Sequence, residues 1–295
     1  LRKERDIAVP VIERWGNALQ YTPAFQGDTL VVRKAIKQNS RAFEFASLKY
    51  RSKKENVLPV VKYYGTMLAF ASGELRNDFD VVKAAVTDDG DAYEFASDAL
   101  KRDQTIINVA VGDLEDHNVA THLPKEIVED SKYMLNLLHK NGAMLRHLPQ
   151  YQHSREHVLA AVSDYGRELY TVPHFNNDRE IVLHALDASN GYVLEFASEE
   201  LQNDPFVVLV ACKQSNGGEG LAHASDALKH DRAFLLRALQ ANSLTAGHWP
   251  DEVAQDIDFV VRAEMMRTVS NEYHTAALRH TVESEEFKAA LAKAR

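Results

Sequence analysis

The sequence predicts an all-α protein, a right-handed α-solenoid of about ten repeats of about 25 residues each. Three observations predict this fold. A five-residue phrase close to FEFAS recurs along the chain, and a small residue, replaced by His117 in one copy, stands seven positions before the last residue of the phrase or its variant. No segment shows the sustained alternation that marks a β-strand. A unit of this length cannot bury its apolar face alone, so such units stack on one another.

The residue that ends each phrase, which we call the anchor residue, divides the repeats into two classes. In the Ser class the small residue and the anchor form the pairs Ser40/Ser47, Gly65/Ser72, Gly90/Ser97, Gly191/Ser198 and Gly218/Ser225. In the Pro class the pairs are Gly16/Pro23, His117/Pro124, Gly142/Pro149, Gly166/Pro173 and Ser243/Pro250. Successive anchors lie 24 to 27 residues apart, and chance does not produce this regularity.

A helix start is predicted five or six positions after most anchors, where a short polar side chain can accept hydrogen bonds from the free amides of the first turn. Apolar residues follow three, four and seven positions later, which is the spacing of one buried helical stripe. We expect one helix of about three turns there in each repeat. The predicted N-cap residues are Asp28, Asp78, Asp103, Asp130, Ser154, Asp178, Asp204, Asp231 and Asp256.

The small residue about 12 positions after the cap is predicted to end the long helix. Gly65, Gly90, Gly142, Gly166 and Gly191 suit the left-handed conformation that often follows a helix. The remaining stretch has room for short helices, of α or 3-10 type, on either side of the anchor. A Ser or Pro anchor followed by acidic or basic residues is typical of a helix start.

Two intervals between anchors are 27 residues long, and the extra residues fall in GDLEDH (112–117) and QSNGG (214–218). Insertions in a solenoid map to loops on one face, so these two lengthened turns are candidate interaction loops. The alternative is that the extra residues are tolerated in surface loops and have no function. The candidate residues are Asp113, Glu115, Asp116, Gln214, Asn216 and Glu219.

The two ends of the chain differ from the middle. Residues 1–4 match the repeat tail at 75–78, so the array, predicted over 1–266, begins in the middle of a repeat. We therefore expect a segment of a larger protein or assembly. After about residue 266 the repeat pattern stops, and 267–295 are predicted to be capping helices with a polar outer face.

The composition limits the kind of binding partner and the cellular compartment that we expect. A net charge of −9 disfavours the wrapping of a phosphate backbone, which relies on Lys and Arg. The single cysteine, Cys212, lies in an apolar run, so it is interpreted as a buried hydrophobe, and no disulfide framework exists. No apolar run approaches the roughly 18 to 20 residues of a membrane span. The prediction is a soluble, cytoplasmic protein that binds a protein or peptide.

No residue pattern indicates catalysis, a metal or a cofactor, and none is predicted. His153 and His157 are four apart, but the H-E-x-x-H motif of zinc enzymes is missing. The acidic turn at 88–91 lacks the ligand spacing of a calcium loop. Phosphate-binding and nucleophile-elbow motifs are also missing from the sequence.

The stretch ELRNDFDVVKAAVTDDGDAYEFASDALKRD (74–103) resembles the domain-of-unknown-function 4116 repeat family. The likeness extends over roughly residues 1–265, whereas the HLP and WP turns of the Pro class look more like leucine-rich repeat variants with alternating α and 3-10 helices. The resemblance implies a helical repeat protein and brings no catalytic residues with it.

The leading functional prediction is a non-catalytic scaffold for protein–protein interaction, because a solenoid holds its core constant while its surface varies. One alternative is a helical repeat that reads nucleic acid. Such a protein would need basic residues at equivalent helix positions of its repeats. Arg33, Lys83 and Arg237 occupy such positions, but His184 and Leu209 interrupt the row. The other alternative is an enzyme with its site in the lengthened turns.

Overall fold

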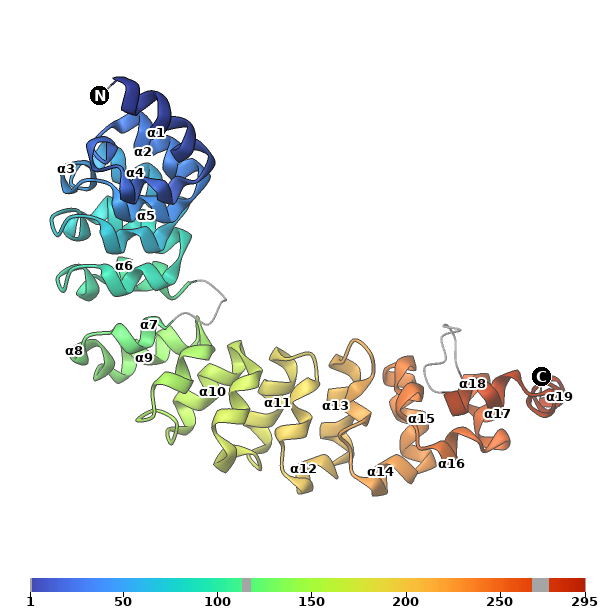
Figure 1. The fold of residues 1–295 in the computed structure, drawn as a ribbon. Coiled ribbons are helices and arrows are strands. Elements are labelled where there is room, and N and C mark those ends of the chain that lie inside the picture. The colour runs from blue at the N-terminus through green and yellow to red at the C-terminus, as the bar shows by residue number, and fades with distance from the viewer. Residues whose placement is uncertain (1, 113–117, 267–275, 295) are drawn as a thin grey trace. The chain divides into compact units, whose positions relative to one another are not determined.

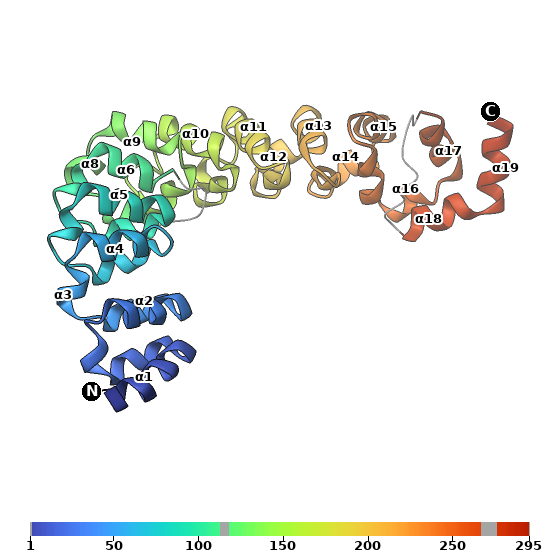
Figure 2. The ribbon, with the colours of Figure 1, turned by 90° about the horizontal axis from the view of Figure 1, so that it is seen from above.

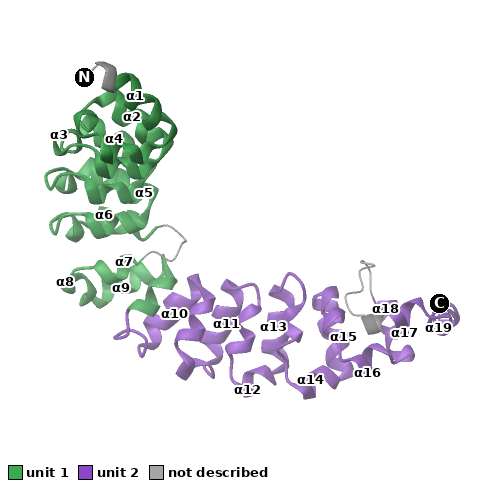
Figure 3. Cartoon of the chain, in the orientation of Figure 1, with its two compact units in different colours: residues 1–147 green, residues 148–295 purple. Residues whose placement is uncertain are grey.

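The computed structural model describes residues 2–112, 118–266 and 276–294, and over these residues every regular element is a helix (Figure 1). This confirms the predicted all-α repeat solenoid. The chain divides into two compact units, unit 1 (Leu1–His147) and unit 2 (Leu148–Arg295) (Figure 3).

Each unit is a row of long helices, one for each repeat. Many consecutive long helices pack against each other, for example α10 on α11 and α11 on α13, as both ribbon views show (Figures 1 and 2). In unit 1 they are α1 (Arg2–Arg14), α2 (Thr29–Gln38), α4 (Lys54–Val61), α5 (Phe79–Asp88), α6 (Gln104–Ala110) and α9 (Ser131–Leu138). In unit 2 they are α10 (Arg155–Asp164), α11 (Arg179–Ala188), α13 (Pro205–Gln214), α15 (Arg232–Ala241) and α17 (Ile257–Met266).

Short helices connect the long ones and alternate between α and 3-10 geometry, as predicted. Those of α type are α3 (Leu48–Arg51), α7 (Val119–His122), α8 (Lys125–Val128), α12 (Glu199–Gln202), α14 (Asp226–His230) and α16 (Asp251–Ala254). The longer 3-10 helices are η1 (Gly16–Tyr21), η3 (Ser40–Phe45), η4 (Gly65–Phe70), η6 (Gly90–Phe95), η8 (Gly142–His147), η9 (Gly166–Thr171), η11 (Tyr192–Phe196) and η13 (Ser243–His248). The brief ones are η2 (Pro23–Phe25), η5 (Leu75–Asn77), η7 (Leu100–Arg102), η10 (Pro173–Phe175) and η12 (Glu219–Leu221).

The N-cap prediction is confirmed at eight of the nine positions. Each of the eight aspartates accepts at least one hydrogen bond from an amide of the first helical turn, as Asp204 does from Phe206 and Val207. Ser154 is different: it precedes α10, but its hydroxyl contacts Nδ1 of His157 at 2.8 Å instead of capping an amide. Eight of the eleven long helices named above thus have a cap carboxylate at their start, where the helix dipole favours negative charge.

These cap carboxylates also bind the neighbouring repeat. A basic residue in the first turn of one long helix pairs with the cap aspartate of the next, as Arg155 does with Asp178 at 2.7 Å and Lys54 with Asp78 at 2.8 Å. The resulting row of ion pairs, which we call the cap ladder, holds adjacent repeats in register. Its other members are Arg5–Asp28, Arg179–Asp204 and Arg232–Asp256.

Ser anchors add a second contact between repeats. The amide of each Ser anchor donates to a carbonyl of the preceding repeat, as Ser198 does to Asn176 at 2.9 Å. The Ser198 hydroxyl also lies 2.6 Å from Oδ1 of Asn177. A Pro anchor cannot donate because it has no N–H. After Pro173 the His174 ring takes over, with Nε2 2.9 Å from the Gln152 carbonyl.

The reason for a glycine at the small-residue position differs from the one predicted. Among the described glycines only Gly191 and Gly218 have positive φ, so the left-handed prediction is wrong for Gly65, Gly90, Gly142 and Gly166. A Cβ at Gly166 would stand 2.1 Å from the Ala185 carbonyl oxygen in the next repeat's helix. Gly16, Gly65 and Gly191 approach Ala35, Ala85 and Ala211 in the same way. The glycine is needed for close backbone approach between repeats.

The core consists of the apolar stripe on each long helix together with buried residues of most 3-10 helices. Ile181, Val182 and Ala185 of α11 are fully buried, and so is Leu194 of η11. The aromatic residue two positions after this η residue is only half-buried, as at Phe196. It therefore covers the edge of the stack.

α1 is the exception to this burial. Residue 4 corresponds to the cap residue Asp78 in the repeat pattern, so Ile7 corresponds to Val81. Val81 and its counterpart Ile181 are fully buried. Ile7 is 71% exposed, and Val11, at the seventh position, is 38% exposed. The outward face of α1 is thus an uncovered end of the stacked core.

At the other end, α18 (Ala276–Glu283) and α19 (Glu285–Ala294) follow the last long helix. α19 packs against α17, and its Phe287 is buried. The array boundary at 266 stays a prediction. No helix within the described residues has the length and apolar character needed to cross a membrane.

We predict that Gly166→Ala destabilises the protein by about 1–3 kcal/mol, because the new methyl group would overlap the Ala185 carbonyl and push two repeats apart. Gly73→Ala is the matched control, since nothing lies within 4 Å of a Cβ there. Urea unfolding followed by circular dichroism measures both. Equal effects of the two substitutions would show that close approach is not the constraint.

Ile181→Ala is expected to cost about 2–5 kcal/mol of unfolding free energy, because it leaves a cavity in a closed part of the core. The same substitution at Ile7 is expected to cost less than about 0.5 kcal/mol, because that side chain is already 71% exposed. The comparison is made by urea unfolding. A large loss at Ile7 would mean that another surface covers α1 in solution.

The cap ladder predicts a loss of stability in acid. Hydrogen bonding to Arg155 is the main cause that lowers the pKa of Asp178, against partial burial and with help from the amides of Ile181 and Glu180. Since its pKa is lowered in the folded state from the usual 3.8, the contribution of Asp178 is fully present above pH 3.8 and is lost as the pH falls through the folded-state value.

We therefore expect the urea concentration at the unfolding midpoint, measured at pH values from 7 to 2.5, to decrease once the pH is below about 4. Asp178→Asn should reduce the size of this fall. Glu199→Gln, which removes an exposed carboxylate outside the ladder, serves as the control. An unchanged pH profile for Asp178→Asn would contradict the role given to the ladder.

Candidate interaction pocket

Only one of the two lengthened turns lies within the described residues. Asp113, Glu115 and Asp116 fall in the range 113–117, which is outside them. In the second turn Gln214 is used internally, because its amide donates to Asp187 of the preceding repeat at 2.6 Å. The first lengthened turn therefore stays a prediction.

The rest of the second turn is also fixed by hydrogen bonds within the protein. Glu219 accepts a hydrogen bond from the Gly217 amide at 2.9 Å, and the Asn242 side chain donates to the Ser215 carbonyl at 2.7 Å. Asn216 is the exposed member of the candidate set here. The turn is a structured junction between repeats, and only Asn216 presents an unoccupied polar side chain among Gln214, Asn216 and Glu219.

His153 and His157 are not brought together. His157 is buried and stacks on Tyr151 with ring centroids 4.3 Å apart, whereas His153 is exposed and stacks on His174 at 4.5 Å. Both rings thus serve packing in unit 2. Within the described residues no group of three or more His, Cys, Asp or Glu side chains could hold a metal ion.

Cys212 is fully buried in α13, as expected for a small hydrophobe. Burial raises the pKa of its thiol to about 12, so the reactive thiolate is scarce at neutral pH. This side chain has a packing role.

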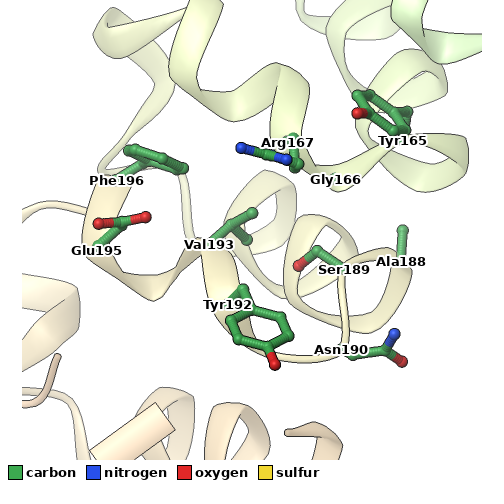
Figure 4. Close-up of a pocket in the computed structure, with 10 residues that line it drawn as sticks. All are labelled: Tyr165, Gly166, Arg167, Ala188, Ser189, Asn190, Tyr192, Val193, Glu195 and Phe196. Atoms are coloured by element: carbon green, nitrogen blue, oxygen red, sulfur yellow. The ribbon is translucent and has the colours of Figure 1, made fainter. Parts of the chain in front are cut away.

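A pocket of about 390 Å³ lies between two consecutive repeats of unit 2 (Figure 4). We call it the η9–η11 pocket. Its wall is built from the start of η9, the end of α11 and η11. The volume is within the range of about 300–1,000 Å³ that is usual for ligand sites. The side chains that define it are Tyr165, Arg167, Asn190, Tyr192, Glu195 and Phe196.

A strained turn shapes the floor of this pocket. Asn190 has φ 54° and Gly191 has φ 81°, so two successive residues adopt the left-handed conformation where α11 ends. Asn and Gly are the residues that tolerate this conformation best. The hydroxyl of Ser189 donates to the Ala185 carbonyl at 2.6 Å and closes the last helical turn. The sequence Ser-Asn-Gly thereby turns the chain away and leaves the space open.

The charged side chains of the pocket form no ion pairs within the described part of the protein. Arg155 and Arg179 belong to the cap ladder, but Arg167 makes no ion pair with another described residue. The Glu195 carboxylate has no ion-pair partner within the described residues either. Both residues are exposed, so each can receive an opposite charge from a ligand.

Aromatic rings surround these charges. Tyr192 is 48% exposed, and Phe196 is half-buried against Tyr170 in an edge-to-face contact at 5.3 Å. In Figure 4 Arg167 extends toward Phe196 and Glu195, and Tyr165 stands at the opposite side. A guanidinium, a carboxylate and phenol rings around an apolar space suit the binding of a side chain or short peptide segment.

Sequence reasoning missed this pocket, because its members lie in different repeats and share no motif. Two signals were present: the Asn190-Gly191 pair, and tyrosine at 165 and 192 next to the small-residue position. Neither signal shows that the intervening space is open. That depends on how η9 and η11 pack.

Comparison with known proteins returns one family. Residues 4–51, 53–101 and 178–229 each match the family model described as a domain of unknown function, DUF4116, and these ranges make up half of the chain. The matched ranges contain all five Ser anchors, and the unmatched stretches contain four of the five Pro anchors, Pro124, Pro149, Pro173 and Pro250. No curated protein and no solved structure matches the chain.

Proposed function

The chain belongs to the DUF4116 family of repeats, and from this premise we propose that it is a non-catalytic scaffold that binds another protein through the η9–η11 pocket. A stacked repeat array suits this role because its core is held constant while its surface side chains vary.

The observation that carries the proposal is the pair of uncommitted charges beside an apolar space. In unit 2 the basic residues at helix starts are spent on the cap ladder, whereas Arg167 and Glu195 have no ion-pair partner among the described residues. Leaving them unpaired gives the fold no stability. It does give a partner two charges of opposite sign at a fixed position.

The pocket suits one apolar or aromatic side chain of a partner, flanked by charges. Aromatic and arginine side chains in well-packed pockets dominate the binding energy of protein interfaces. Charges at the rim contribute more to orientation and association rate than to affinity. The net charge of −9 favours a basic or mixed partner over an acidic one.

Site-directed photo-crosslinking tests the proposal. We expect a benzophenone side chain at Tyr192 to capture a specific protein at near-native expression, and Arg167→Glu to reduce the captured amount at least about tenfold, since one charge-assisted contact is worth about that much. Tyr21, 79% exposed in unit 1, is the matched control position.

Capture of the same proteins from positions 192 and 21 would contradict the proposal, as would capture that Arg167→Glu leaves unchanged. Thermal unfolding of the Arg167→Glu protein should equal that of the wild type, because the side chain is exposed and unpaired.

A further inference from the structure

A second hollow, in unit 1, has a different charge from the rest of the protein. It lies between α2 and α4 and has a volume of about 360 Å³. We call it the α2–α4 groove. The side chains that matter for its chemistry are Arg33, Ile36, Lys37, Tyr50, Tyr63 and Tyr64.

The two cations of this groove stand without carboxylate partners among the described residues. Nearby basic residues are paired: Lys34 with Glu13, and Lys54 with both Asp78 and Asp80. Arg33 and Lys37 are exposed and make no ion pair. No acidic side chain lines the groove, which is therefore positive within a chain of net charge −9.

The neighbouring groove between α4 and α5 provides an internal comparison. It has a similar volume of about 440 Å³ and also contains two cations, Lys62 and Lys83. Two aspartates, Asp80 and Asp88, line it as well. Its formal charge is balanced, and it lacks aromatic side chains. The positive charge of the α2–α4 groove is therefore not a general property of the surfaces between long helices.

The wall of the groove presents a neutral hydroxyl beside one of the cations. Tyr50 is 3% exposed, and the positive charge of Arg33 acts on its phenol. Burial raises the pKa of Tyr50, against the opposing effect of Arg33, so the phenol stays protonated at neutral pH. The Asn56 amide donates to the Tyr50 carbonyl at 3.2 Å and fixes this residue. An oxygen ligand would find a guanidinium and an O–H close together.

Aromatic rings stand at the rim. Tyr63 is 75% exposed and Tyr64 is 43% exposed, although tyrosine rings normally bury much of their area. Ile36 and Val60 provide a buried apolar wall beneath them. A flat aromatic ring bound here would cover exposed apolar surface and would stack on at least one tyrosine.

We propose that the α2–α4 groove binds an aromatic ring that carries an oxyanion, with Arg33 and Lys37 holding the anion and the tyrosines holding the ring. Guanidinium groups bind phosphate and carboxylate oxygens through two parallel hydrogen bonds, and lysine adds a point charge. A free aryl phosphate and a phosphotyrosine side chain share this chemistry.

Isothermal titration calorimetry of the full chain with phenyl phosphate tests the proposal. Phenol and inorganic phosphate, which each carry half of the chemistry, are the comparison probes. We expect phenyl phosphate to bind at least about tenfold more tightly than either, because it gains both the charge-assisted hydrogen bonds and the ring contact. An N-acetyl-Ala-phosphotyrosine-Ala-amide peptide forms the second arm.

Arg33→Gln should weaken phenyl phosphate binding at least about tenfold, and Lys37→Gln should weaken it by a smaller factor. Lys83→Gln, in the charge-balanced neighbouring groove, should leave it unchanged. Tyr63→Ser should weaken phenyl phosphate binding but not inorganic phosphate binding. Circular dichroism melting curves establish that each variant folds like the wild type.

Three results would overturn the proposal: no binding of phenyl phosphate at millimolar concentration, equal affinity for inorganic phosphate, or unchanged affinity after Arg33→Gln. Peptide binding at least as tight as that of phenyl phosphate supports the proposal and identifies a modified protein as the source of the ligand. Weaker peptide binding supports it with a free small molecule as the source. The groove and the η9–η11 pocket lie in different units, so each test fails or succeeds separately.

Discussion

The structure depends on the close approach of two backbones at the junction between repeats. At Gly16, Gly65, Gly166 and Gly191 the Cα atom lies so near the next repeat's alanine carbonyl that no side chain fits. This contact sets the distance between repeats. The Ser-anchor hydrogen bond and the cap ladder also join neighbouring repeats, and each connects residues more than 20 positions apart.

The cap ladder decides which charges remain for binding. A cap aspartate accepts hydrogen bonds from its own helix and takes a cation from the preceding one, so most acidic and basic residues at helix starts are already used. Surface ion pairs contribute little individually, about 0–1 kcal/mol, but a row of them fixes the register. Among the charges outside this row, Arg33 and Lys37 in unit 1 and Arg167 and Glu195 in unit 2 line hollows and have no ion-pair partner within the described residues.

The two repeat classes differ in how firmly neighbours are joined. Ser97 and Ser198 each donate an amide and a hydroxyl to the preceding repeat, whereas Pro has no amide hydrogen to give. His174 compensates at one Pro repeat through its ring. The family matches also avoid most Pro repeats. Pro repeats are therefore the places where this chain departs from the family pattern.

Local signals in the sequence determined the helices. The aspartate caps, the apolar stripe and the seven-residue interval act within one repeat, because a cap or a stripe depends on residues a few positions apart. Tertiary structure alone decided why glycine stands at 65 and 166, since the carbonyl that excludes a side chain belongs to the next repeat. It also decided which charges stay unpaired and where space stays open, as at Arg167 and Arg33, because both depend on residues about 25 positions away whose packing no local pattern encodes.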